Sequence, residues 1–168
     1  MYKPLKLDLL TSLHNELARM HEQALASAAE AQDEANYHVG AMESRYDTFK
    51  EEAQYLTEAQ KLRLLHLKGQ MQACKQLQQR LQHEDVRFSR VQIGALVKLL
   101  SPKEEDVWVF IAPAGLNLYR CDPQLGMVTC VTEEAPLVSH AIGLEVGEEY
   151  EVFNQGAAPL WYEIVQIG

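Results

Sequence analysis

The feature that most constrains the fold of this chain is a pair of long apolar stripes with helical spacing. Apolar residues recur every three or four positions over residues 8–45 and again over residues 48–82. The members are Leu10, Leu13, Leu17, Met20, Ala24, Ala31 and Ala35 in the first stripe, and Ala53, Leu56, Leu64, Leu67, Met71, Cys74, Leu77 and Leu81 in the second. Each stripe predicts a helix of about 35 residues, which at a rise of 1.5 Å per residue is about 50 Å long. Such helices are not stable alone, so we expect them to pair as an antiparallel coiled-coil hairpin.

The segment between the stripes, residues 44–55, is predicted to form the tip of this hairpin. We place the turn between about Gly40 and Thr48, because a glycine inside a helical pattern weakens the helix. The first stripe changes from leucine to alanine toward the turn. Small residues let two helices approach closely but bury less apolar area, so we expect the hairpin to be thinnest, and easiest to fray, at its tip.

Charge is divided into zones along the chain, which carries a net charge of −9. Residues 22–58 hold nine acidic residues against Arg45 and Lys50, whereas residues 61–103 hold nine basic residues against Glu84 and Asp85. After Lys103 there are eleven acidic residues and a single basic one, Arg120. Such segregation is typical of partner-binding surfaces, or of solvated faces that differ by chance. The acidic zones would repel phosphates, which disfavours binding to free DNA or RNA.

Other compositional features exclude several classes of protein. No apolar run approaches the roughly 20 residues of a membrane span, and Asp8 interrupts the N-terminal region early, so we expect a cytoplasmic protein without a signal peptide. Three cysteines, at irregular spacing, do not make a disulfide framework or a zinc site. Cys74 falls on the second apolar stripe and is predicted to be a small core residue.

The second half of the chain changes to runs rich in β-branched and aromatic residues. Strands are predicted at 91–99, 107–111, 127–132, 149–153 and 161–167, with one short helix over 137–142. Pro136 suits the first turn of that helix and Gly143 its end. The fold class is therefore α+β: a helical hairpin in residues 1–84, followed by a small antiparallel sheet domain in residues 85–168.

Several segments of this sequence resemble the bacterial GreA/GreB transcript-cleavage factors, a family of transcription elongation factors. Residues 135–152 read APLVSHAIGLEVGEEYEV, residues 162–167 read YEIVQI, and residues 51–55 read EEAQY. The resemblance covers nearly the whole chain and is most specific at the first of these segments. The family's serine is replaced here by Ala135, its basic residue after the glycine by Leu144, and its tip aspartate stands one position early, at Asp47, with Thr48 in the usual place.

The resemblance implies an FKBP-like C-terminal domain and a function on RNA polymerase. The hairpin would enter the polymerase secondary channel and stimulate transcript cleavage by the polymerase active site, so that the protein is not itself an enzyme. The resemblance implies that the protein has no cofactor of its own but shares a Mg²⁺ with that active site. It also implies that the protein is a monomer that contacts nascent RNA only indirectly and binds neither a membrane nor free DNA. It also implies that Pro136, Leu137, Gly143 and Gly147 belong to a polymerase docking motif.

The tip residues have two interpretations. Asp47 and Glu51 stand four apart and would point the same way on the first turn of a helix, where two carboxylates can position a Mg²⁺ and a water. Alternatively, residues 48–51 are a capping box, and acidic residues simply favour a helix N-terminus. Further candidates for tip contacts are Glu43, Tyr46 and Phe49, of which the aromatic pair could stack on a nucleotide or pack across the tip.

Three other functions remain open from the sequence. The same docking with an altered tip would block the channel and inhibit transcription, and the displaced Asp47 favours this. A peptidyl-prolyl isomerase would need an aromatic-lined pocket, but the six aromatic residues of the predicted strands can all be core: Trp108, Phe110, Tyr150, Phe153, Trp161 and Tyr162. A coiled-coil adaptor without polymerase contact is the third.

Overall fold

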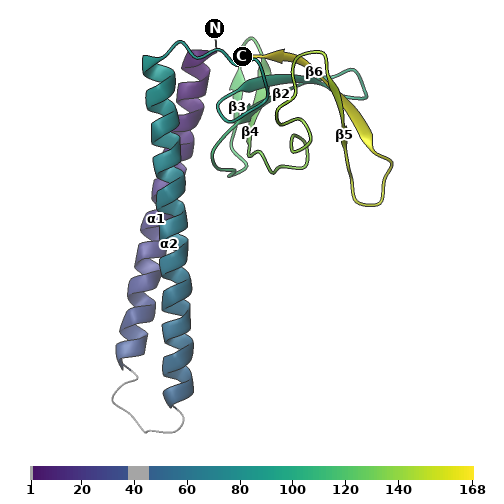
Figure 1. The fold of residues 1–168 in the computed structure, drawn as a ribbon. Coiled ribbons are helices and arrows are strands. Elements are labelled where there is room, and N and C mark those ends of the chain that lie inside the picture. Colours follow the sequence, from purple (N-terminus) through teal and green to yellow (C-terminus); the bar gives the residue numbers. More distant parts are fainter. Residues whose placement is uncertain (1, 38–45) are drawn as a thin grey trace. The chain divides into compact units, whose positions relative to one another are not determined.

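A computed structural model of the chain describes residues 2–37 and 46–168, without the side chains of residues 31–32, 34–37 and 46–57. Within these residues two helices are followed by six strands, drawn in Figure 1. Their bounds are α1 Lys3–Tyr37, α2 Tyr46–His83, β1 Leu96–Leu100, β2 Asp106–Ile111, β3 Tyr119–Asp122, β4 Gly126–Val131, β5 Glu149–Val152 and β6 Leu160–Ile167. The α+β class and the order of a helical hairpin before a small sheet are confirmed.

The two helices pair side by side and run in opposite directions, as predicted (Figure 1). Leu13, Leu17 and Ala24 of α1 and Leu67 of α2 are all buried, so these members of the two stripes lie on the contact face. On α2, Leu62 and Leu65 stand outside this stripe and are 68% and 66% exposed. The pairing of the helices therefore follows the helical spacing and not simply the number of leucines.

Contacts divide the chain into two compact units that cut across the helices. One unit contains residues 1–14 and 73–168, and the other contains residues 15–72. The first unit thus includes the sheet, the beginning of α1 and the end of α2; we call these two helix ends the helix bases, residues 3–14 and 73–83. The second unit is the remainder of the hairpin. The domain boundary predicted at residue 84 stays a prediction.

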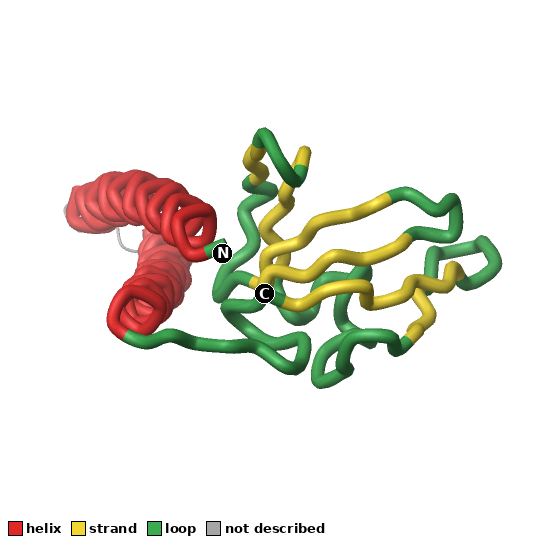
Figure 2. Tube along the Cα trace, turned by 90° about the horizontal axis from the view of Figure 1, so that it is seen from above, coloured by secondary structure: helices red, strands yellow, loops and turns green. Residues whose placement is uncertain are grey.

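The six strands form one sheet in the order β3-β4-β2-β1-β6-β5, seen as the yellow layer in Figure 2. Four neighbouring pairs are antiparallel, but β2 and β4 are parallel, so the sheet is mixed and the prediction of a purely antiparallel one was wrong. The reason is β3, a strand that the sequence did not reveal. It lies between β2 and β4 in the chain and reverses the direction once, so β4 returns alongside β2 in the same orientation.

The core of the first unit lies at β1 and β2, the two middle strands of the sheet. Val109, Phe110 and Ile111 follow one another on β2 and have no exposed area, which requires cover on both faces of the sheet. In the helix bases, Leu9 and Leu10 are adjacent and both buried. Neighbouring helix positions differ in direction by about 100°, so the start of α1 is covered on two sides, by more than the partner helix alone.

The predicted short helix over 137–142 is instead a succession of turns. Most of its backbone hydrogen bonds join residues three apart, as from the Ala141 N–H to the Val138 carbonyl at 2.8 Å. At its end, the Gly143 N–H donates to the Val91 carbonyl at 2.8 Å, in the segment that precedes β1. Hydrogen bonds between residues three apart form tight turns and not an α-helix, and the Gly143 N–H joins the end of this segment to the residues before β1.

Candidate functional site

The predicted metal-positioning residues fall at the beginning of α2. Because this helix begins at Tyr46, Asp47 and Glu51 occupy its second and sixth positions. Positions four apart in a helix lie on the same face, which is the arrangement that the sequence interpretation required. The side chains of Tyr46, Asp47, Phe49 and Glu51 lie outside the described residues, as does the whole of Glu43, so their roles stay predictions.

The capping-box interpretation of residues 48–51 stays a prediction. A capping box has its threonine just before the first helical residue, whereas α2 as the structure describes it includes Thr48 as its third residue. The partial positive charge at a helix N-terminus still stabilises an acidic residue in the first turns of the helix.

The predicted docking motif lies in the segment over residues 135–147, which we call the docking segment. Pro136, Gly143 and Gly147 are exposed, whereas Leu137 is half-buried. Both glycines have positive φ, of 87° and 88°, which explains why glycine is needed at each. The hydroxyl of Tyr150 donates to the Leu137 carbonyl at 2.8 Å and fixes the segment to β5. The motif is thus a largely exposed turn that one hydrogen bond joins to β5.

Two aromatic side chains close to this segment were predicted as core but are exposed. Phe153 is 58% exposed and Trp161 is 52% exposed. Phe153 contacts His140 edge to face, with ring centroids 5.4 Å apart, and the His140 Nδ1 lies 3.1 Å from the Glu151 carbonyl oxygen. Trp161 lies opposite Glu151 in the pairing of β5 with β6. These contacts bring exposed aromatic groups to the same edge of the sheet as the docking segment.

Strand alternation could have predicted this exposure. On β5, Tyr150 and Val152 are buried, so the period of two assigns Phe153 to the opposite face, with Glu149 and Glu151. The prediction held for Trp108, Phe110 and Tyr150, which are buried in the core. Core aromatic residues are not open to a substrate, so these three do not form the proline pocket that an isomerase would need.

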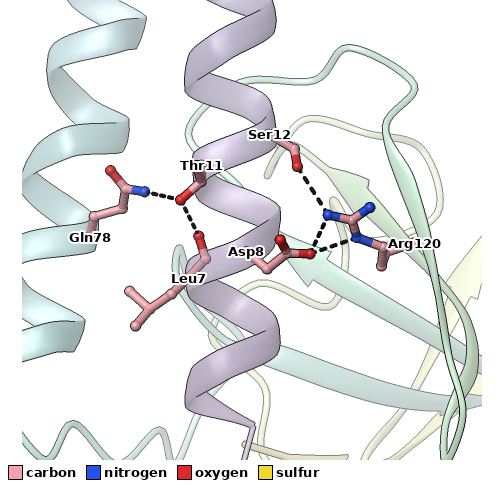
Figure 3. Close-up of polar contacts among 6 residues, drawn as sticks. All are labelled: Leu7, Asp8, Thr11, Ser12, Gln78 and Arg120. Atoms are coloured by element: carbon pink, nitrogen blue, oxygen red, sulfur yellow. Dashed lines mark hydrogen bonds and ion pairs between the residues drawn. The ribbon is translucent and has the colours of Figure 1, made fainter.

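The sheet is joined to the base of α1 by polar contacts drawn in Figure 3. Arg120 on β3 donates from Nε to Asp8 Oδ2 at 2.6 Å and from Nη2 to Ser12 Oγ at 3.3 Å. Beside them, Gln78 of α2 donates to the Thr11 hydroxyl at 2.9 Å. The single basic residue of the acidic C-terminal zone therefore joins the sheet to α1.

The described residues add two observations on site classes. Among residues 2–30, 33 and 58–168, whose side chains are described, no group of three or more His, Cys, Asp or Glu residues is gathered as a metal site. Neither helix, as far as the structure describes it, is both long enough and apolar enough to cross a membrane.

Neither the scan against family models nor the search of curated proteins finds a match. Solved structures with a similar fold include the transcription factor Gfh1, at 15% identity, with 92% of each chain covered and a TM-score of 0.37. They also include GreA factor homolog 1 (Gfh1) of Thermus thermophilus, at 14% identity, covering 92% of this chain and 94% of that one, with a TM-score of 0.34. A prokaryotic transcription elongation factor GreA/GreB from Nitrosomonas europaea matches 56% of this chain and 78% of its own at 18% identity, with a TM-score of 0.35. In fold, the chain is similar to these transcription factors.

Proposed function

We propose that this protein binds RNA polymerase as a Gre-type transcription elongation factor. The tip of the α1–α2 hairpin enters the polymerase secondary channel and stimulates transcript cleavage there. The observation that supports this most directly is the position of Asp47 and Glu51, four apart in the first turns of α2, at the turn of a hairpin whose helices have 35 and 38 residues. The resemblance of residues 51–55 and 135–152 to that family supports the same proposal.

Under this proposal the chemistry belongs to the polymerase, and this chain supplies ligands. Hydrolysis of an RNA phosphodiester by a two-metal mechanism needs both ions held in place. Mg²⁺ takes carboxylate oxygens together with water and phosphate, so Asp47 and Glu51 are suitable residues to complete such a site. The protein brings no complete active site and is not itself an enzyme.

The sheet domain contributes the docking surface in this proposal. The exposed Pro136, Phe153 and Trp161 offer apolar and aromatic contact area, which is enriched at protein interfaces. Tyr150 holds the docking segment in one conformation through its hydrogen bond to the Leu137 carbonyl, so little ordering is needed on binding.

A second candidate, a channel-blocking inhibitor, is favoured by one specific observation. The tip aspartate stands four residues before Glu51, whereas the family has it three residues before, and Thr48 occupies that place. Residues three apart and residues four apart both share a helix face. Positions 47 and 48 nevertheless differ in direction around the helix by about 100°, so an aspartate at position 47 starts from a different point on the helix than one at position 48.

Transcript cleavage by backtracked RNA polymerase complexes in Mg²⁺ tests the proposal. We expect the protein to accelerate cleavage, Asp47→Ala and Glu51→Ala to abolish the acceleration, and Glu58→Ala to retain it. Glu58 is an exposed acidic residue of α2 that lies 3.0 Å from Lys61, so it controls for the loss of one negative charge. Slowed elongation that survives both tip substitutions would instead support the inhibitor.

Binding to core polymerase separates docking from the action of the tip. Phe153→Ala and Trp161→Ala should weaken co-purification with the polymerase, whereas Asp47→Ala should not. A protein that fails to bind core polymerase at low salt would contradict both the cleavage factor and the inhibitor, and would favour the coiled-coil adaptor.

A further inference from the structure

A pocket of about 500 Å³ lies at the beginning of α1, within the unit that contains the sheet. Tyr2 and Lys6 line it from the start of the chain, Leu81 from the end of α2, and Phe88 from the segment before β1. We call it the Lys6 pocket. It uses none of the tip or docking residues discussed above, so it needs an explanation of its own.

The side chain of Lys6 is unusual because it is charged and yet only 4% exposed. Its ammonium lies 4.2 Å from the centroid of the Phe88 ring and makes no hydrogen bond or ion pair with any residue that the structure describes. A cation over an aromatic face recovers part of the lost hydration. A buried charge without a counter-ion is nevertheless costly, and an anion bound in the pocket would offset that cost.

The start of α1 adds positive potential to the same place. The helix begins at Lys3 and has no acidic residue in its first turn, so no side chain offsets the partial positive charge of its N-terminus. Helix N-termini of this kind bind anions readily. The Lys6 side chain, which is 4% exposed and has no ion-pair partner among the described residues, is the second, independent feature that points to the same ligand charge.

The other charged side chains that line the pocket make no described ion pair with Lys6. The Lys3 ammonium donates to the Gln82 carbonyl at 2.9 Å. Glu84 is directed to Arg80, at 3.4 Å, and Asp85 to Arg87, at 3.9 Å, with all four side chains more than half exposed. Tyr2 accepts a hydrogen bond from Gln166 through its hydroxyl, at 2.9 Å. The acidic side chains thus lie in solvent, and the buried charge in the pocket is positive.

We propose that the Lys6 pocket binds a small organic anion. Its carboxylate or phosphate group would pair with the Lys6 ammonium near the start of α1, and its apolar part would lie against Phe88 and Leu81. Burial lowers the pKa of Lys6 to about 8, and the ligand would raise it again by stabilising the charged form.

Calorimetric titration of the full chain with phenyl phosphate, benzoate and the uncharged benzyl alcohol tests this proposal. We expect at least one of the two anions to bind and benzyl alcohol not to, and the two anions distinguish a phosphate from a carboxylate ligand. Lys6→Met should weaken binding at least about tenfold, the value of one charge-assisted hydrogen bond. Lys103→Met, which removes an exposed lysine between β1 and β2, should leave binding unchanged.

A second measurement needs no variant. Because only protonated Lys6 pairs with the anion, binding to the unmodified protein should weaken about tenfold between pH 7 and pH 9, whereas an ordinary lysine would stay charged over that range. Failure of both anions to bind, equal binding to Lys6→Met, or equal binding at the two pH values would each overturn the proposal.

Discussion

Asp8, in the second turn of α1, and Arg120 of strand β3 form an ion pair (Figure 3), although they are 112 residues apart in the chain. Arg120 also donates to Ser12, one helical turn further along α1. The guanidinium therefore spans two successive turns of the helix. With roughly half of each side chain exposed, the pair is accessible to solvent and to salt.

The first prediction concerns this pair. We expect Arg120→Ala and Asp8→Ala each to lower the free energy of unfolding, with a coupling free energy of about 0.2–1 kcal/mol in a double-mutant cycle, the range measured for exposed pairs. Urea denaturation in 50 mM and 500 mM NaCl provides the measurement. The coupling should shrink at the higher salt concentration, and a coupling that does not depend on salt would show that the pair acts by packing.

The second prediction concerns the pH dependence of stability due to Lys6. Its pKa is lowered to about 8 in the folded protein from 10.5, so the unfolded chain binds more protons between these two pH values and stability rises with pH across that window. Lys6→Met should therefore be more stable than the unmodified protein at pH 7, by up to about 3 kcal/mol. The difference should decrease progressively as the pH rises from 8 to 10.5.

Urea denaturation of both proteins at pH 7 and pH 10.5 checks this second prediction. Burial raises the pKa of the Cys74 thiol to about 11. Burial, and to a smaller extent the nearby Cys74, raise the pKa of the Cys130 thiol to about 12. Both thiols therefore affect stability at high pH. They are present in both proteins, and their effect cancels in the difference. An identical difference at the two pH values would mean that Lys6 is not titrating as a buried ammonium.

The third prediction compares two glycines. Gly94 has a φ of 92°, and a Cβ there would lie 2.9 Å from Leu77 Cδ1 and 3.1 Å from Phe88 Cζ. Gly94→Ala should therefore destabilise the protein by about 1–3 kcal/mol, through backbone strain and overpacking. Gly69→Ala, inside α2 with open space around its Cβ, should stabilise it by about 0.5–1 kcal/mol. Thermal unfolding monitored by circular dichroism distinguishes the two, and the same sign for both would contradict the prediction.

The fourth prediction concerns the three free cysteines. Cys121 is exposed on β3, whereas Cys74 and Cys130 are buried and their raised pKa values leave little of the reactive thiolate at neutral pH. Ellman's reagent at pH 8 should therefore titrate one thiol per chain quickly in the native protein and three in 6 M urea. The variant Cys121→Ser should remove the fast reaction, and fast labelling that persists in it would contradict this assignment.

The hairpin was predictable because its physical signal is long and redundant. The helical spacing of apolar residues recurs many times in each stripe. Burial of Leu13, Leu17 and Leu67 confirms the predicted positions of these three residues on the contact face. The same spacing contained an overlooked signal, because Lys6 stands four residues before Leu10 and therefore on the same apolar stripe. A charged residue on a core stripe indicates either a buried partner or a site.

The sheet was less predictable because its deciding features are short or depend on distant contacts. Strand β3 has only four residues, and Tyr119, Arg120 and Cys121 are all exposed, so no alternation marks it. The segment around Val138 forms turns, and the Gly143 N–H joins its end to the Val91 carbonyl, a contact between segments about 50 residues apart that no local pattern encodes. The tip side chains were predicted by resemblance, and their chemistry awaits the cleavage experiment.

The division of the chain into units has a consequence for the order in which the protein assembles. A ribosome produces residues 2–14 before any strand of the sheet, yet their packing partners in the same unit include Trp108, Arg120 and Gln166. Strand β6, which lies between β1 and β5, is made after the other five strands of the sheet. Residues 15–72 form a unit of their own, in which the described contacts join neighbouring helices, and local contacts form quickly. We therefore expect the two helices to pair during synthesis, before the sheet is complete. Until β6 pairs with β1 and β5, the leucines at the start of α1 remain uncovered and available to a chaperone.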